Sequence, residues 1–195
     1  GPQRRQQGRV LKKLLKKARY TEFGQTYHFD EILLHKHPEK IFQQRVPVFD
    51  YDSIYEQWWH RTLDGIPDVE YFALSSGTSG SASKYIPITN DLMRGNRIVM
   101  IKQMLTLRNY ENIPVKSISK GWLMLGGSTD LQKGPGYYSG DLSGITAKKV
   151  PFWFSPFYKP GKKIARTKDW NTKLDEIVEQ APHWDIGFVV GVPAW

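Results

Sequence analysis

The strongest chemical signal in the sequence is a run of six small residues that combines four hydroxyl groups with two glycines. The run is Ser75, Ser76, Gly77, Thr78, Ser79 and Gly80. Glycine lets the backbone turn so that successive N–H groups point the same way and cradle an anion. Hydroxyl groups donate hydrogen bonds to the same oxygens, and Lys84 adds positive charge shortly after the run. These residues therefore predict a loop that binds the phosphates of a nucleotide.

The same residues partly match three other loop motifs. A Walker loop places lysine directly after its last glycine, whereas Lys84 follows Gly80 by four residues. Ser81-x-x-Lys84 matches the nucleophile signature of penicillin-recognising serine enzymes, but the partner motifs Ser-Asp-Asn and Lys-Thr-Gly are absent. Gly77-x-x-Gly80 matches the loop of KH nucleic-acid modules, which lies between helices. A serine acyl-enzyme at Ser81 stays open as an alternative, and a nucleic-acid module is a minor one.

The segments that would position this loop have the composition of an α/β layer. Four short apolar runs predict β-strands. They are residues 71–74, 84–88, 122–125 and 186–190. Apolar positions at helical spacing predict a long helix over about 91–109, buried on two or more sides, and a second helix that begins after Asp169 or Asn171. We expect a mixed or largely parallel sheet with packed helices, and a loop-rich region from Gly126 to Lys168.

The residues before the first strand carry helical patterns. We therefore expect a helical N-terminal segment over 1–69 and an α/β portion of the same large domain over 70–195. One apolar helix face is predicted from Val10, Leu11, Leu14, Leu15 and Ala18. Asp30 is expected to cap a short helix after a turn at 21–24, and Asp50, Asp52 or Ser53 to cap one that carries Trp58 and Trp59 inward. Because the chain ends directly after a strand, we expect it to be the first part of a longer protein.

Charge and composition exclude several classes of protein. The chain has 28 basic and 19 acidic residues, but residues 1–21 hold eight of the basic residues and no acidic one, so the rest is nearly neutral. This distribution disfavours a nucleic-acid-binding face and leaves open a non-catalytic module whose basic amphipathic helix binds an anionic partner. The absence of cysteine excludes disulfides and thiolate nucleophiles. No apolar run is long enough to span a membrane, and a cytoplasmic protein fits best. No metal site is expected at His35 and His37.

Several stretches resemble one known family. Residues 72–80, with Lys84 and Pro87, resemble the first ATP motif of the acyl-adenylate-forming superfamily. Further stretches are similar to the Gretchen Hagen family of auxin-responsive acyl acid amido synthetases, in its bacterial branch. These stretches are residues 18–24, 45–51, 140–145 and 191–195. Together they extend over nearly the whole chain, which is identified on this basis as the N-terminal part of such an enzyme's large domain.

The resemblance implies a ligase that joins a carboxylic acid to AMP and then transfers the acyl group to an amino acid. It implies that residues 75–80 and Lys84 hold the phosphates of ATP, that Mg²⁺ bridges those phosphates, and that the long helix lines the acyl pocket through Met100, Gln103 and Met104. Gln103 stands where some plant relatives carry a carboxylate-binding arginine, so neither the acid nor the catalytic residues are assigned. The family's other ATP motifs and its mobile C-terminal domain lie downstream, so residues 1–195 alone are expected to lack turnover.

Overall fold

The computed structural model describes residues 2–59, 69–75, 83–107, 109–110 and 114–191. The chain divides into two compact units, residues 1–62 and residues 63–195. Each unit has a hydrophobic cluster of its own. They are therefore described one after the other.

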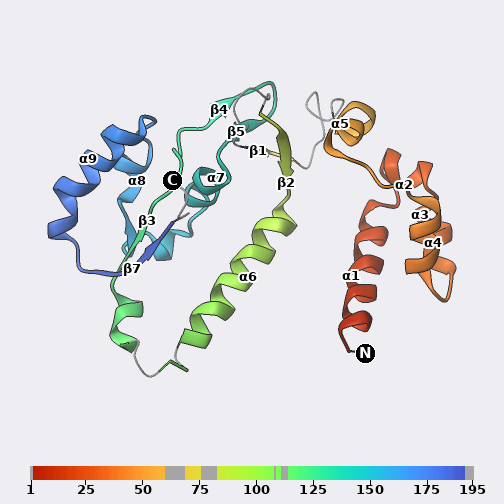
Figure 1. The fold of residues 1–195 in the computed structure, drawn as a ribbon, viewed down its shortest axis with the longest axis horizontal. Helices are drawn as coiled ribbons and strands as arrows, with labels where there is room; N and C mark the ends of the chain where they lie inside the picture. Colours follow the sequence, from red (N-terminus) through yellow and green to blue (C-terminus); the bar gives the residue numbers. More distant parts are fainter. Residues whose placement is uncertain (1, 60–68, 76–82, 108, 111–113, 192–195) are drawn as a thin grey trace. The chain divides into compact units, whose positions relative to one another are not determined.

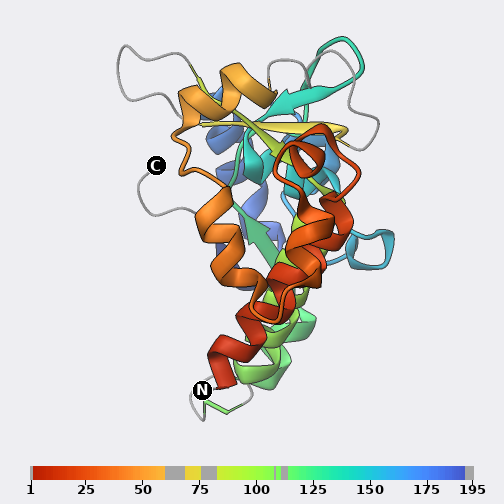
Figure 2. The same cartoon turned by 90° about the vertical axis from the view of Figure 1, so that its right-hand side faces the viewer.

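The first unit is helical (Figure 1). Its helices are α1 (Pro2–Ala18), α2 (Glu22–Thr26), α3 (Phe29–Leu34), α4 (Pro38–Arg45) and α5 (Tyr51–Ile54), and α5 continues as a π-helix over Tyr55–Trp59. Figure 2 shows α1 beside α3 and α4, which agrees with the contacts among these three helices. Their shared core is built on Leu15, Phe29 and Ile32, with Leu11 and Ala18 packed against it. The helical character of this segment is thus confirmed.

The apolar face of α1 is narrower than the sequence predicts. Leu11, Leu15 and Ala18 face the core because spacings of four and three residues return to one side of a helix. Val10 and Leu14 are more than half exposed, so their assignment to the packed face was wrong. The lysines of α1 are exposed. Part of the apolar face of this basic helix is therefore used inside its own unit.

The helix starts in this unit show which capping predictions hold. Asp50 caps α5, where its Oδ1 accepts the Ser53 N–H at 2.8 Å, as one of the three predicted candidates. Asp30 does not cap α3. The residue before that helix is His28, in the left-handed region at φ 53°, and Asp30 lies in the first turn. Helices α2 and α4 were not predicted, although Thr21 caps α2 through its hydroxyl.

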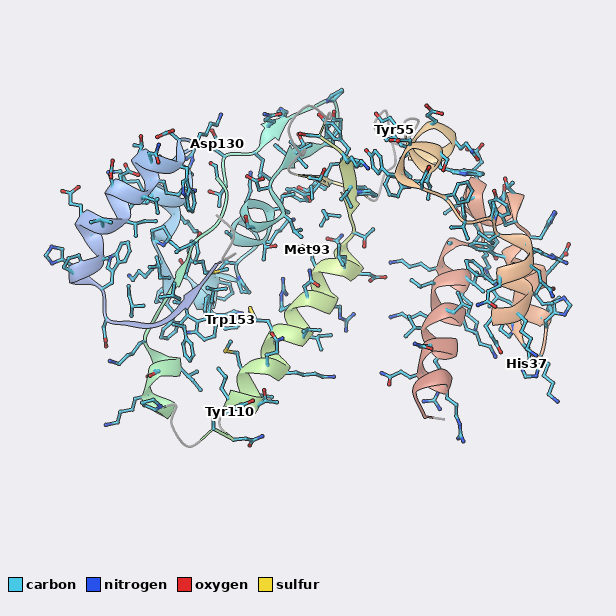
Figure 3. All side chains as sticks on the ribbon, viewed as in Figure 1. His37, Tyr55, Met93, Tyr110, Asp130 and Trp153 are labelled. Atoms are coloured by element: carbon cyan, nitrogen blue, oxygen red, sulfur yellow. The ribbon has the colours of Figure 1, made fainter. Side chains whose placement is uncertain are left out.

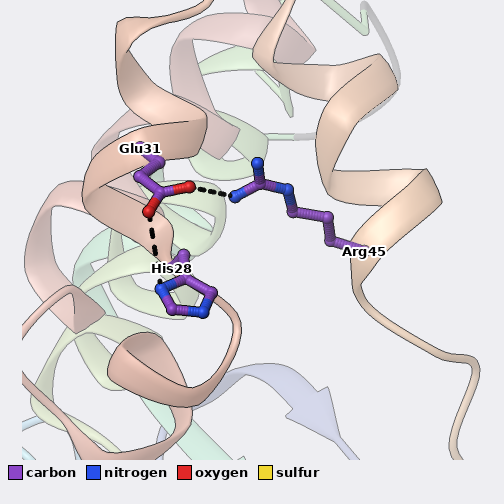
Figure 4. A network of polar contacts seen from close by, with 3 residues as sticks. All are labelled: His28, Glu31 and Arg45. Carbon is purple, nitrogen blue, oxygen red and sulfur yellow. Dashed lines mark hydrogen bonds and ion pairs between the residues drawn. The ribbon is translucent and has the colours of Figure 1, made fainter.

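Two groups of side chains join elements within the helical unit. Figure 4 shows Glu31 of α3, whose Oε2 accepts a 2.7 Å hydrogen bond from Nη1 of Arg45 at the end of α4. His28 Nδ1 lies 3.7 Å from the other Glu31 oxygen. Trp58 packs its ring against Phe23, with centroids 4.8 Å apart, so the inward orientation predicted for Trp58 is confirmed. Such exposed ion pairs contribute at most about 1 kcal/mol, so the aromatic and aliphatic core dominates.

The second unit contains two β-sheets (Figure 1). The first has the order β2 (Tyr85–Ile88), β1 (Tyr71–Leu74), β5 (Tyr138–Gly140) and β4 (Gln132–Lys133), and the second has the order β6 (Tyr158–Lys159), β3 (Gly121–Met124) and β7 (Ile186–Val190). Strand β1 pairs antiparallel with β2 and parallel with β5, whereas β3 is parallel to both its neighbours. The expected α/β class is confirmed: the first sheet is mixed, and the second is parallel.

Helices accompany both sheets. They are α6 (Asn90–Leu107), α7 (Leu142–Lys148), α8 (Gly161–Ala165) and α9 (Trp170–Gln180). Helix α7 packs on β1, where Ile145 joins a core cluster with Tyr71, Ala73, Ile88 and Leu131. Helices α7 and α8, which interrupt the expected loop-rich region, were not predicted. Asp169 caps α9, as one of the two predicted candidates.

Helix α6 differs most from its prediction. The sequence indicates burial on several sides, but no described residue of α6 is buried. Met93 in its first turn packs against the core cluster of the first sheet (Figure 3), and the remaining apolar residues, from Ile98 to Leu105, are mostly exposed. The helix is apolar, as the sequence indicates, but within the described residues nothing covers its apolar side chains from Ile98 to Leu105. Strand β7 is likewise exposed at Val189 and Val190.

Candidate functional site

The predicted phosphate loop begins and ends in a β-hairpin. The Ser75 N–H donates to the Lys84 carbonyl oxygen at 3.0 Å, and the Lys84 N–H donates to the Ser75 hydroxyl oxygen at 3.2 Å. These bonds extend the β1–β2 pairing by one residue on each side. Ser75 and Lys84, the described members of the predicted site, therefore face each other at the base of the loop.

The other predicted members of this loop lie outside the described residues. They are Ser76, Gly77, Thr78, Ser79 and Gly80, together with the alternative nucleophile Ser81. Their phosphate-binding role stays a prediction. The backbone of Lys84 pairs as the next rung of a hairpin, whereas the Ser-x-x-Lys mechanism needs both residues on one helix face. Strands β1 and β2 flank the loop, whereas a KH module would place helices there.

A cavity of about 490 Å³ lies where the parallel strands of both sheets end. Its walls include the last residue of β1, Leu74, and residues at or just after the ends of the other parallel strands: Met124, Leu125, Asp141, Tyr158, Pro160, Val190 and Gly191. The carboxyl edge of parallel strands is the usual ligand-binding edge of α/β sheets. A volume of this size suits a small organic molecule. The predicted phosphate loop therefore leaves β1 beside a cavity of ligand size.

Two glycines bring the wall of this cavity close to α7. A Cβ at Gly127 would lie 2.4 Å from Asp141 Oδ2, and a Cβ at Gly144 would lie 2.1 Å from the Ser128 carbonyl oxygen. The Gly127 N–H also donates to the Ser143 hydroxyl at 2.8 Å. The loop after β3 and the start of α7 are thus held in contact because neither glycine carries a side chain.

Lys173 of α9 is the buried charged residue at this cavity. Only 3% of its surface is exposed, and its Nζ donates to the Gly126 carbonyl oxygen at 3.2 Å. Burial lowers the pKa of the Lys173 ammonium from its ordinary value, while the Asp141 and Glu176 carboxylates act in the opposite direction. Among the described residues, no carboxylate lies within ion-pair distance of this ammonium.

Neither Lys173 nor Asp141 was expected from the sequence to be a site residue. The signal for Lys173 is its position on the buried face of α9, four residues before Ile177. A lysine on an apolar helix stripe is uncommon, since lysine is almost never fully buried unless paired. Asp141 follows β5 directly, and a side chain after a parallel strand is expected at the carboxyl edge.

The three residues expected to line an acyl pocket lie on α6. Met100, Gln103 and Met104 follow each other at helical spacing, with Gln103 exposed and Met104 half-buried. None of them lines the cavity at the carboxyl edge. Their role as acyl-pocket residues stays a prediction.

The described residues contain no group of three or more His, Cys, Asp or Glu side chains that could hold a metal ion. His35 and His37 are exposed, and His37 Nδ1 lies 3.3 Å from Glu39 Oε1. Among the described helices, none has both the length and the apolar character needed to cross a bilayer.

Comparisons with known proteins agree on one family. The model of the GH3 family N-terminal domain matches residues 3–178. Two solved structures are similar: the GH3.15 acyl acid amido synthetase, at 20% identity and a TM-score of 0.50 over 69% of this chain, and the AtGH3.15 acyl acid amido synthetase in complex with 2,4-DB, at 19% identity and a TM-score of 0.51 over 85%. The matches cover 24% and 29% of those chains, so this chain spans less than a third of their length. No curated protein matches. At these identities the likeness establishes the fold.

Proposed function

Because the chain belongs to the GH3 family, we propose that the whole protein is an ATP-dependent acyl acid amido synthetase. In the first step a carboxylate oxygen of the acid bonds to the α-phosphorus of ATP, and pyrophosphate leaves. In the second step the amine of an amino acid bonds to the acyl carbon, AMP leaves with the C–O bonding electrons, and the amine loses a proton. The names of both similar structures support this reaction.

The observation that carries the proposal is the position of Leu74. This residue ends β1, lines the cavity at the carboxyl edge, and directly precedes the predicted phosphate loop. A loop that starts there is well placed to hold a triphosphate beside an acid bound in the cavity. Catalysis of this kind depends mainly on alignment of the two reactants and on neutralising charge that develops on the leaving group.

The described residues of the loop fit the phosphates of ATP in their chemistry. The Ser75 hydroxyl accepts one hydrogen bond from Lys84 and keeps its own O–H available to donate. The exposed Lys84 side chain carries a positive charge, and Lys84 faces Ser75 across the base of the loop. We propose that both groups, with residues 76–80, bind and orient the β- and γ-phosphates.

Magnesium is part of this proposal through the nucleotide. When bound, Mg²⁺ neutralises charge on the phosphates, and it commonly uses substrate phosphates and water as most of its ligands. The work of the protein is then to hold the phosphates, align the acid and exclude water.

The test is acid-dependent exchange of labelled pyrophosphate into ATP, measured on the whole protein. Lys84→Ala should lower the exchange rate by about 10²-fold, because one charged contact to the leaving group is removed. Lys133→Ala, in the exposed strand β4, is the matched control and should leave the rate unchanged. Ser76→Ala with Thr78→Ala tests the part of the loop outside the described residues.

Two results would contradict the proposal at different levels. An exchange rate that is unchanged in Lys84→Ala would remove the phosphate role of that lysine. A wild-type protein without exchange for any carboxylic acid would refute the synthetase function itself. The partners in this proposal are a small carboxylic acid, an amino acid and the remaining part of the same chain, and a cytoplasmic location and the bacterial branch stay predictions with it.

A further inference from the structure

Within the described residues, the buried ammonium group of Lys173 has no carboxylate within ion-pair distance, although the charges of Asp141 and Glu176 act on it from further away. An ammonium group has three N–H donors, and the described structure gives it one acceptor, the Gly126 carbonyl oxygen at 3.2 Å. Taking such a charge out of water is costly unless an anion or several acceptors replace the lost hydration. Lysine at this position is thus unfavourable for folding by itself, which points to a role in binding.

The surroundings of Lys173 indicate what kind of anion would fit. Lys173 and Asp141 are the charged side chains among the described walls of the 490 Å³ cavity, and most other walls are apolar, including Leu125, Leu142 and Val190. A triphosphate would place several charges against such walls. A small molecule with an apolar body and a single charged end matches them better.

Asp141 does not cancel this charge complementarity. Its side chain is exposed, and within the described residues it forms no ion pair with Lys173, although its charge favours the ammonium form of that lysine. Its carboxylate packs against Gly127 in the loop that follows β3, on a wall of the same cavity. The nearly buried Lys173 therefore offers the stronger interaction with an anion that enters the cavity, since charges interact more strongly away from water.

We propose that Lys173 is a specificity-determining residue that receives the carboxylate of a small apolar acid in the cavity at the carboxyl edge of the sheets. The proposal rests on the synthetase function above and adds to it the residue that holds the carboxylate of the acid. The apolar body would pack against the walls, while the ammonium holds the carboxylate toward the ends of β1 and β3.

The experiment uses the whole protein and compares acids with their uncharged amides. The probes are benzoate, phenylacetate and hexanoate, with benzamide, phenylacetamide and hexanamide, and binding is measured by calorimetry or ligand-observed NMR. Lys173→Met removes the charge at similar length, Lys173→Gln keeps a donor for the Gly126 carbonyl, and Lys163→Met on the exposed side of α8 is the matched control. The two variants at 173 should raise the Kd of the best acid by about 10- to 100-fold.

The expected pattern separates binding from a structural role. Both variants at 173 should bind the amides with wild-type affinity, and the Lys163→Met control should bind the acids with wild-type affinity. The thermal midpoint of Lys173→Met should stay equal or rise, because a buried charge is gone. Acid affinity that is unchanged in both variants overturns the proposal, as does a wild type that binds none of the three acids. A loss confined to ATP binding also overturns it, because the charge would then serve the nucleotide.

Pyrophosphate exchange distinguishes this inference from the proposed function. If exchange occurs with one of these acids and the variants raise its KM without changing kcat much, the charge acts in ground-state binding, as proposed. If exchange occurs with equal KM in wild type and variants, the function holds and the role of Lys173 fails. If acids bind through Lys173 but no exchange occurs, the binding site holds and the synthetase function fails.

Discussion

Gly144→Ala tests how closely α7 must approach the loop after β3. A Cβ at Gly144 would lie 2.1 Å from the Ser128 carbonyl oxygen, whereas carbon and oxygen atoms ordinarily meet at about 3.3 Å or more. The obstacle is backbone, so no side-chain rotation removes it. Helix α7 or the loop must move by about 1 Å, and overpacking of this kind costs about 1–3 kcal/mol.

The net change includes the helix preference of alanine. Alanine is favoured over glycine inside a helix by up to about 1 kcal/mol, which offsets part of the clash. Because the obstacle at Gly144 is rigid, we expect a net loss of about 2 kcal/mol. Gly95→Ala in α6 is the matched control, since no atom lies within 4 Å of its added Cβ. That variant should gain about 0.5–1 kcal/mol.

Native-state hydrogen exchange on the whole protein is the suitable assay, because it reports the opening free energy of each helix and does not need a two-state transition. Amides of α7 should lose protection in Gly144→Ala, and amides of α6 should gain protection in Gly95→Ala. Since Ser143 and Leu142 line the cavity, the shift of α7 should also weaken binding of the acid. Equal gains in both variants would refute the close approach on which this reasoning depends.

Three further substitutions have outcomes set by single contacts. Asp169→Ala removes the carboxylate that caps α9 by accepting a backbone N–H at 2.8 Å, so the α9 amides should lose about 1 kcal/mol of protection against hydrogen exchange. Asp169→Asn should keep most of this protection, and an equal loss in both variants would contradict the capping role. Ile32→Ala should destabilise the helical unit by about 2–5 kcal/mol in urea unfolding, whereas Leu34→Ala, at a residue 87% exposed, should change it by less than about 0.5 kcal/mol. The Tyr71 hydroxyl lowers the pKa of the Glu70 carboxyl, so its contribution is present above the ordinary carboxyl pKa and is lost as the pH falls through the lowered value. Glu70→Gln should therefore cost under about 1 kcal/mol at pH 7 and almost nothing once the pH is well below the lowered pKa, and a difference that persists in strong acid would refute the carboxylate's role.

Local signals in the sequence predicted much of the second unit. Strands β1, β2, β3 and β7 and helix α9 were found because each combines a short apolar run with a clear start or stop. The short helices α7 and α8 were missed because small residues and glycines there resemble a loop. Gly144 shows why: it is chosen for close packing against the Ser128 carbonyl, which no local pattern reveals.

The candidate site was predictable only in part. The run at 75–80 and Lys84 could be found because their chemistry is continuous in sequence. The cavity could not, because its walls come from the ends of strands in two sheets and become neighbours only when the strands pair. Lys173 was not singled out from the sequence, since its burial depends on the Gly126 loop far away in the chain. The exposure of α6 escaped prediction because apolar composition does not specify what covers it.

The pairing of β3 has a consequence for synthesis of the protein. Its two partners, β6 and β7, lie more than 30 and more than 60 residues downstream, whereas the helical unit is held by contacts between neighbouring helices. Local contacts form early and distant pairings form late. At ribosomal rates β3 waits roughly 3–12 s for β7 to emerge, with Trp122 and Leu123 uncovered on its edge. Newly made chains of this protein should therefore depend on chaperones after the helical unit has already folded.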